Sequence, residues 1–126
     1  IPSLIRKFHF AEKDFVECWG DGTPLREFMY VDDFADACLI AMRSKIENAE
    51  HLNVGSGEEI SIRSLAEMIS KITNFSGKII WDKSKPNGTP KRSLSYSKIL
   101  DLGWKPKYKL DKGLKNLYEW FKENIQ

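Results

Sequence analysis

The 126-residue sequence has only two cysteines and two histidines, and it has no long hydrophobic run. Cys18 and Cys38 do not stand at zinc-ligand spacing from either histidine, so we expect reduced, cytoplasmic thiols and no metal site. No apolar stretch approaches the roughly 18 to 20 residues that span a bilayer, which argues against membrane insertion. With so few histidines, the chain also has few groups for general acid–base catalysis.

A strong charge of one sign is missing as well. The 20 basic residues are nearly balanced by 18 acidic ones, and the net charge of +2 lacks the bias expected of a protein that binds nucleic acid. Between Lys78 and Lys115, however, eleven basic residues accompany only three acidic ones. We therefore expect the C-terminal third to attract anions.

The glycine-rich fingerprints of nucleotide-binding loops are absent too. The sequence contains neither GxGxxG nor GxxxxGK[ST], and the GSGEE segment that begins at Gly55 lacks the third glycine. No Ser, His and Asp set and no Cys and His pair stands out. No motif in the sequence predicts that this chain catalyses a reaction by itself.

The hydrophobic pattern that is present alternates between helical spacing and short β-branched or aromatic runs. It predicts helices over 1–8, 33–44, 62–72, 97–102 and 112–121, and strands over 15–19, 51–54 and 78–82. This succession indicates an α/β fold with mixed or parallel pairing. About three strands beside four or five helices are too few for a complete doubly wound sheet.

Polar residues stand where three of the predicted helices begin. We expect Asp32, Ser61 and Asp111 to act as N-caps. Asp32 and Asp33 also resemble a catalytic pair, but at a helix start they are better explained as a cap and a dipole partner. The helix that follows should bury one apolar face, made by Phe34, Ala37, Cys38, Ala41 and Met42.

The stretch WGDGTPLREFMYVDD, which begins at Trp19, contains the first candidate binding residues. The guanidinium of Arg26 follows a rigid turn and suits a diphosphate or a carboxylate, although an ion pair with Glu27 or with the acids at 32 and 33 explains it equally well. Trp19 ends a predicted strand. It could stack on a base or a sugar, but packing is the commoner role of tryptophan.

A second candidate is the basic loop over 83–92, with the letters KSKPNGTPKR. Its proline and glycine residues prevent regular structure, and backbone amides freed in this way could bind a phosphate together with Lys83, Lys85, Lys91 and Arg92. The alternative is a solvated basic loop. For Lys7, on the first predicted helix, a solvated position is likewise the simpler interpretation.

Three long motifs together resemble one family. WGDGTPLREFMYVDDFADA, HLNVGSGEEISIRSLAE and SKPNGTPKRSLSYSKILDLGWKPKYKLDKGL are similar to segments of the GDP-L-fucose synthases, which belong to the extended short-chain dehydrogenase/reductases. GDGxxxREFxxVDD, NVGSG and LGWKP recur across many nucleotide-sugar epimerases and dehydratases. The tryptophan before the glycine turn, PLREF, and DKSKPNGTPKR followed by SLSYSKI are what indicate the GDP-L-fucose synthase branch.

The resemblance implies an NADPH-dependent 3,5-epimerase and 4-reductase that works as a homodimer on a GDP-linked keto sugar. In such enzymes an N-terminal Rossmann lobe holds NADP(H) and supplies a YxxxK pair, and the acid–base cysteine and histidine lie upstream of the matching segment. The one YxxxK match here, Tyr118 with Lys122, falls in the wrong helix, and Cys18 and His9 do not match the acid–base pair. We therefore expect residues 1–126 to be a C-terminal substrate-binding region that is inactive without its own N-terminal lobe.

The resemblance also implies a binding site. By motif position, Lys7, Trp19, Arg26 and Lys78 match residues that contact the GDP-sugar, and Arg92 is a further candidate. Asp32 and Asp33 stay structural, and the helix after VDD and the NVG strand should pack against the cofactor lobe. Ser95, where bacterial relatives often have aspartate, leaves the substrate's details open. The remaining alternatives are another nucleotide-sugar epimerase or reductase, and a stand-alone nucleotide-sugar-binding or interaction module.

Overall fold

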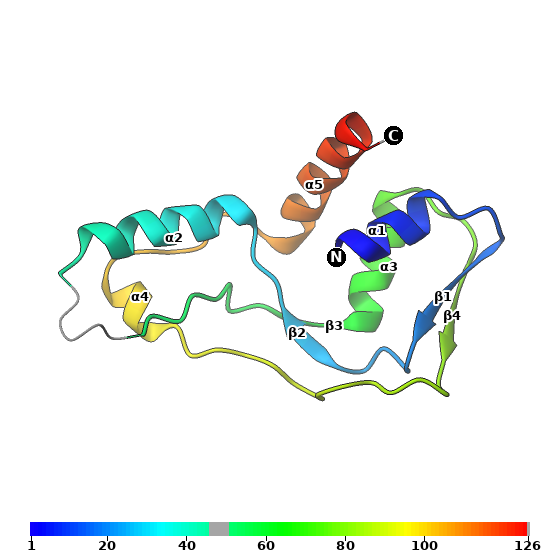
Figure 1. Cartoon of the computed structure of the whole chain (residues 1–126), viewed down its shortest axis with the longest axis horizontal. Helices are drawn as coiled ribbons and strands as arrows, with labels where there is room; N and C mark the ends of the chain where they lie inside the picture. Colours follow the sequence, from blue (N-terminus) through cyan, green and yellow to red (C-terminus); the bar gives the residue numbers. More distant parts are fainter. Residues whose placement is uncertain (46–50, 126) are drawn as a thin grey trace.

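Five helices and four short strands alternate along the part of the chain that the structure describes, residues 1–45 and 51–125 of this computed structural model. The helices are α1 (Pro2–His9), α2 (Val31–Arg43), α3 (Ile62–Ile72), α4 (Ser97–Asp101) and α5 (Leu110–Asn124), and the strands are β1 (Phe15–Trp19), β2 (Leu25–Glu27), β3 (Glu59–Ser61) and β4 (Lys78–Asp82). Figure 1 shows a body, formed by α1, α3, α5, β1 and β4, and an arm, formed by residues 31–45, 52–58 and 94–107 with α2 and α4. The predicted α/β class is confirmed.

The sheet of the body consists of β1 and β4, which pair in parallel and end together, with Trp19 opposite Asp82. Side chains alternate along β1, so that Val16 and Cys18 are buried while Trp19 lies on the outer face. Burial raises the pKa of the Cys18 thiol, which keeps it protonated and unreactive. Both strands match the predicted runs.

The second sheet pairs β2 with β3 in antiparallel register, with Arg26 opposite Ile60. The pattern did not predict these three-residue strands, because charged residues occupy much of both. The strand predicted over 51–54 is wrong: this apolar run lies outside the regular elements. A run of β-forming residues becomes a strand only where a neighbouring backbone pairs with it, and the described chain offers none there.

The main core lies where α1 and α5 pack against α3 and the inner face of the body's sheet. Each helix buries residues spaced three or four apart, and the predicted N-cap of α3 is confirmed, since Ser61 Oγ accepts a hydrogen bond of 3.0 Å from Ser64 N. The buried cluster comprises Ile5, Phe8, Val16, Cys18, Leu65, Ala66, Ile69, Leu114, Tyr118 and Phe121.

The arm has a much smaller core, in which Ala37 of α2 packs with Ile99 and Trp104. Trp104 Nε1 donates to the backbone oxygen of Asp33 at 3.1 Å, which ties the segment after α4 to the start of α2. Among the described residues, this cluster has three fully buried members, with partly buried side chains such as Ile40 and Leu52 packed against them.

The predicted caps of α2 and α5 are wrong. Helix α2 has Tyr30 at its N-cap and α5 has Lys109, and neither makes a side-chain capping bond. Asp32 is exposed in the first turn of α2, as Asp111 is in that of α5. There these acids still lie near the positive end of the helix dipole.

The apolar face predicted for α2 is also largely wrong. Ala37 is buried and Ala41 is half-buried, whereas Phe34, Cys38 and Met42 are exposed, Met42 by 82%. The buried side of α2 instead includes Asp33, because the arm packs there against residues 104–108. No helix in the described part of the chain is both long and apolar enough to cross a membrane.

Candidate functional site

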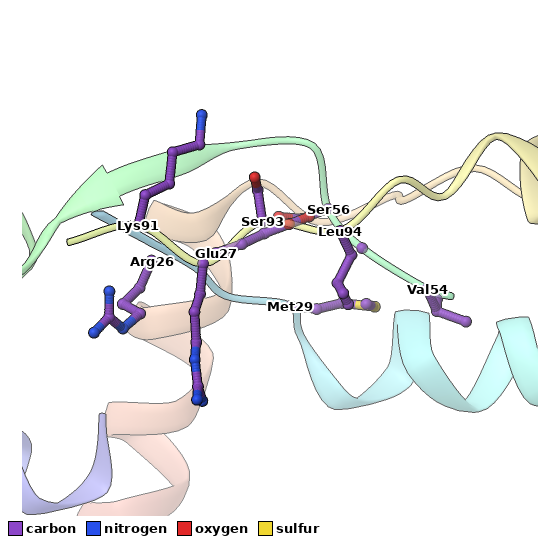
Figure 2. A pocket seen from close by; sticks show the side chains of 10 residues that line it. Arg26, Glu27, Met29, Val54, Ser56, Lys91, Ser93 and Leu94 are labelled. Atoms are coloured by element: carbon purple, nitrogen blue, oxygen red, sulfur yellow. The ribbon is translucent and has the colours of Figure 1, made fainter. Parts of the chain in front are cut away.

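A cavity of about 720 Å³ lies where β2 meets residues 91–94 and the turn over 54–56. Figure 2 shows Arg26 at one end of this cavity, and Met29 and Leu94 close together toward the other. The cavity therefore has a cationic end and an apolar end. Its lining residues are Arg26, Glu27, Met29, Val54, Gly55, Ser56, Lys91, Arg92, Ser93 and Leu94.

The end of the loop over 83–92 reaches this cavity because two sets of contacts fix the loop. Asp21 N donates to Asn87 Oδ1 at 2.8 Å, and at the far end of the loop Leu25 N donates to Pro90 O at 2.8 Å. Arg92 N in turn donates to Leu25 O at 3.3 Å. The predicted irregular loop is thus confirmed, and its last residues run beside β2 and bring Arg92 to the cavity.

The glycine turn after β1 receives the Asn87 side chain. Gly20 has a φ of +78°, and a Cβ at this position would collide with the Asn87 amide. Beside it, Asp21 Oδ1 accepts hydrogen bonds from Thr23 N at 2.9 Å and from Thr23 Oγ1 at 2.6 Å. These bonds to the ionised form lower the pKa of Asp21 to about 2, so the turn keeps its negative charge further into acid than a free aspartate would.

The guanidinium of Arg26 lies against the same loop. Its Nη1 donates to Leu25 O at 2.7 Å, and its Nη2 is 3.9 Å from the point where a Cβ on Gly88 would stand. The ion pair with Glu27 that the sequence left open does not form, because Glu27 Oε1 accepts instead from Gly57 N at 2.7 Å. Most of the donors of Arg26 are therefore not used within the described chain.

Arg92, like Arg26, has no acidic partner among the described residues. Within residues 1–45 and 51–125, no carboxylate lies at ion-pair distance from either Arg26 or Arg92. The third cation of the cavity is different: Lys91 Nζ pairs with Glu59 Oε1 at 2.8 Å, and Figure 2 shows its side chain pointing away from Arg26. The positive charge available to a ligand thus comes from the two arginines, and guanidinium groups suit phosphate oxygens.

Trp19 lies outside this cavity, at the end of β1. Its side chain is 66% exposed, and Lys85 Nζ is 5.9 Å from the centre of its ring. An exposed indole offers a stacking surface to a planar ligand on the face that Lys85 does not cover.

Lys7 and Lys78 lie elsewhere around the body's sheet. Lys7 Nζ donates to Glu17 O of β1 at 3.0 Å, and Lys78 begins β4 opposite Phe15, which is about 13 Å along the strand from Trp19. Of the five predicted binding residues, the structure thus brings Arg26 and Arg92 to one cavity and spreads Lys7, Trp19 and Lys78 along the β1–β4 sheet.

Two features of the site were missed from the sequence. The Asn87 side chain joins the basic loop to the glycine turn, yet the pair Asn87 and Gly88 signals only that a turn is present. The apolar wall of Met29, Val54 and Leu94 comes from three distant segments, and no local pattern connects them.

No three His, Cys, Asp or Glu side chains in the described part of the chain are grouped to hold an ion. Tyr118 and Lys122 belong to the packing of α5: the Tyr118 hydroxyl bonds to His9 Nδ1 at 2.9 Å, and Lys122 pairs with Glu119 at 2.7 Å. Neither residue lines the cavity.

Comparison with known proteins shows which enzymes this chain resembles in sequence. The family model of the NAD dependent epimerase/dehydratase family matches residues 1–55. GDP-L-fucose synthase 1 of Arabidopsis thaliana is 44% identical across 99% of this chain, and GDP-L-fucose synthase of Escherichia coli is 41% identical across 98%. The chain spans 39% and 42% of the length of these two relatives.

Solved structures agree on the fold. A GDP-6-OMe-4-keto-L-xylo-heptose reductase from C. jejuni has a TM-score of 0.87 at 32% identity, covering 97% of this chain and 47% of that protein. A GDP-L-fucose synthetase from Naegleria fowleri bound to NADP has a TM-score of 0.85 at 30% identity, covering 98% of this chain and 40% of that protein. The resemblance inferred from the motifs is thereby confirmed: over nearly its whole length the chain is similar to GDP-L-fucose synthases, in a fold shared with part of the Rossmann-type extended short-chain dehydrogenase/reductases.

Proposed function

We propose that this chain is the C-terminal, GDP-sugar-binding region of an NADPH-dependent GDP-4-keto-6-deoxy-D-mannose 3,5-epimerase/4-reductase, an enzyme that makes GDP-L-fucose. The observation that carries the proposal is that Arg26 and Arg92 share one cavity and have no carboxylate partner among the described residues. A sugar diphosphate carries two negative charges. Its phosphate oxygens would accept hydrogen bonds from both guanidinium groups, which no described carboxylate does. The similarity to GDP-L-fucose synthases supports this choice of ligand.

The role of the chain in this proposal is to bind and orient the substrate. NADP(H) would supply the hydride in the whole enzyme, and related solved structures, such as the GDP-L-fucose synthetase from Naegleria fowleri, contain bound NADP. The residues described here lack a glycine-rich fingerprint and a usable YxxxK pair, so we assign them no part in cofactor binding. A separate N-terminal Rossmann lobe would hold the cofactor and the catalytic groups.

The chain alone should therefore bind GDP-sugars without converting them. We expect no NADPH oxidation when the 126-residue chain is mixed with GDP-4-keto-6-deoxymannose, as followed by absorbance. When the chain is part of a whole enzyme, NMR of the product should show inversion at both C3 and C5. Inversion at one centre only would instead assign the chain to a different nucleotide-sugar epimerase or reductase.

We also propose that the whole enzyme is a cytoplasmic homodimer, as the resemblance implies. Light scattering coupled to size exclusion measures the assembly, and cell fractionation measures the location. A monomeric or membrane-bound whole enzyme would contradict this part of the proposal and leave ligand binding untouched.

The arginine site is tested by replacing Arg26 with alanine. Losing a charged hydrogen bond should weaken GDP binding by about 1.5 to 3 kcal/mol, measured by titration calorimetry. Arg26→Lys should give an intermediate loss, because a lysine keeps the charge but not the paired geometry. Arg43→Ala, on α2 and away from this cavity, is the matched control. Unchanged affinity in Arg26→Ala would remove Arg26 from the binding site.

A further inference from the structure

Trp19 and Asp82 end the two strands of the body's sheet side by side. They are register partners in the parallel pair, so their side chains point to the same face of the sheet. That face is the outer one, where Trp19 is exposed, whereas Cys18 and Trp81 point to the other face. Figure 1 shows β1 and β4 running together to this end. A flat aromatic surface thus stands next to a carboxylate.

The Asp82 carboxylate is held in one orientation. Ser84 N donates to Asp82 Oδ1 at 3.0 Å, and Ser84 Oγ donates to the same atom at 2.6 Å. These bonds favour the ionised form and lower the pKa of Asp82. Both hydrogen bonds end on Oδ1, which leaves Oδ2 to accept from a ligand.

This pairing of groups suits one purine base better than another. A base stacks readily on an exposed aromatic ring, whichever base it is. A carboxylate, however, only accepts hydrogen bonds. The Watson–Crick edge of guanine presents two adjacent donors, N1–H and the 2-amino group, whereas the edge of adenine presents an acceptor at N1 beside its amino group. Stacking would give affinity, and the carboxylate would give selectivity.

We propose that Asp82 is a specificity-determining residue that reads the guanine base of the ligand, with Trp19 as the stacking surface beside it. This inference rests on the proposed function, in which the ligand is a GDP-sugar. It goes beyond that function because it assigns the choice of base to a named carboxylate.

The loop over 83–92 connects this base site to the arginine cavity. It leaves β4 at Asp82, is fixed to the glycine turn through Asn87, and passes the Arg26 guanidinium at Gly88. One short loop therefore runs from the carboxylate to the cations. A nucleoside diphosphate that lies along it would place its base toward β4 and its phosphates toward Arg26 and Arg92.

The first experiment compares nucleotides by calorimetry on the 126-residue chain. We expect GDP to bind most tightly, IDP more weakly because it lacks the 2-amino group, and ADP at least about tenfold more weakly than GDP. Absence of GDP binding would overturn the proposed function, and this inference with it. GDP, IDP and ADP bound equally well would overturn the inference alone.

The second experiment replaces Asp82 with asparagine. The new amide can keep its oxygen on Ser84 and present its NH₂ group where Oδ2 was. Asp82→Asn should therefore weaken GDP binding about tenfold and strengthen binding of XDP, which has a carbonyl oxygen in place of the 2-amino group.

The charge change has its own control. Removing one negative charge should slightly tighten binding of any anionic nucleotide, so Asp101→Asn, at the end of α4, measures that effect alone. A circular dichroism melt confirms that each variant is folded. If Asp82→Asn weakens GDP, XDP and ADP by the same factor, or strengthens all three, Asp82 does not read the base and the inference is wrong.

Discussion

The side chain of Asp33 is only 1% exposed, and its carboxylate accepts hydrogen bonds from residues outside its own helix. Its Oδ1 accepts from Lys107 N and its Oδ2 from Tyr108 N, each at 3.0 Å. It therefore joins the start of α2 to the segment before α5. The neighbouring Asp32 is exposed and makes no such connection.

Replacing Asp33 with alanine should destabilise the protein far more than the same change at Asp32. Asp33→Ala leaves two partly buried N–H groups without acceptors, and we expect a loss of about 2 to 5 kcal/mol in the free energy of unfolding. Asp32→Ala removes only a charge near a helix N-terminus, which is a loss below about 1 kcal/mol. Urea unfolding measures both. Similar losses would show that the two acids act alike through the helix dipole.

Asp21 should make the stability depend on acid pH. Its pKa falls from 3.8 to about 2 in the folded chain, so its contribution is fully present above about pH 4 and is lost as the pH falls through about 2. Carbon NMR of the side-chain carboxyl measures the pKa directly. Thr23→Val removes the Oγ1 donor and should raise the pKa of Asp21 toward 3.8. A pKa near 3.8 in the unmodified protein would contradict the turn geometry.

At the scale of elements, the glycine turn is fixed by α3 as well as by the basic loop. Arg63 N donates to Gly22 O at 2.9 Å, and the Arg63 side chain donates to Asp21 O. The Arg63 guanidinium also lies 4.8 Å from the centre of the Trp81 ring. Gly22 lies against that ring, so the turn is held between β4 and α3.

Gly22→Ala should therefore destabilise the protein more than Gly103→Ala. Both glycines have a positive φ, +76° at Gly22 and +88° at Gly103. An alanine held in this backbone conformation is destabilised by about 1 to 2 kcal/mol. At Gly22 the new Cβ would also lie 2.6 Å from the Trp81 ring, whereas at Gly103 nothing lies within 4 Å. We expect about 2 to 5 kcal/mol for Gly22→Ala, with overpacking added to strain. Equal thermal shifts in the two variants would exclude the ring contact as a cause.

The five helices of the described chain and both strands of the body's sheet could be predicted from local side-chain spacing, although the buried face of α2 could not. Strands β1 and β4 and helices α1, α3 and α5 each bury a single face against the same core, so local spacing was sufficient. Strands β2 and β3 could not be predicted, because their pairing joins residues more than 30 positions apart and their charged residues hide the period. The arginine cavity depends on that pairing, so the local pattern could name Arg26 and Arg92 as candidate phosphate ligands but could not bring them to one cavity.

At the scale of the whole molecule, the burial is unequal. In the part of the chain that the structure describes, the core of the body contains ten buried residues and the core of the arm contains three. Helix α2 also carries exposed apolar side chains, among them Phe34, Leu39 and Met42. The arm therefore has little burial of its own to oppose local opening.

Amide hydrogen exchange should reveal this difference as two levels of protection. Amides of α3, inside the main core, should exchange only through opening close to global unfolding, and those of α2 should be at least about tenfold less protected. Trp104→Ala should further accelerate exchange in α2, because it removes the largest residue of the arm's core and the bond to Asp33 O, while α3 stays protected. Leu102→Ala, an exposed position in the same arm, is the matched control and should change neither helix. If α2 and α3 are protected equally, or if Trp104→Ala lowers both together, the arm and the body unfold as one cooperative unit. In that case the exposed face of α2 would be stabilised by contacts outside the arm's own core.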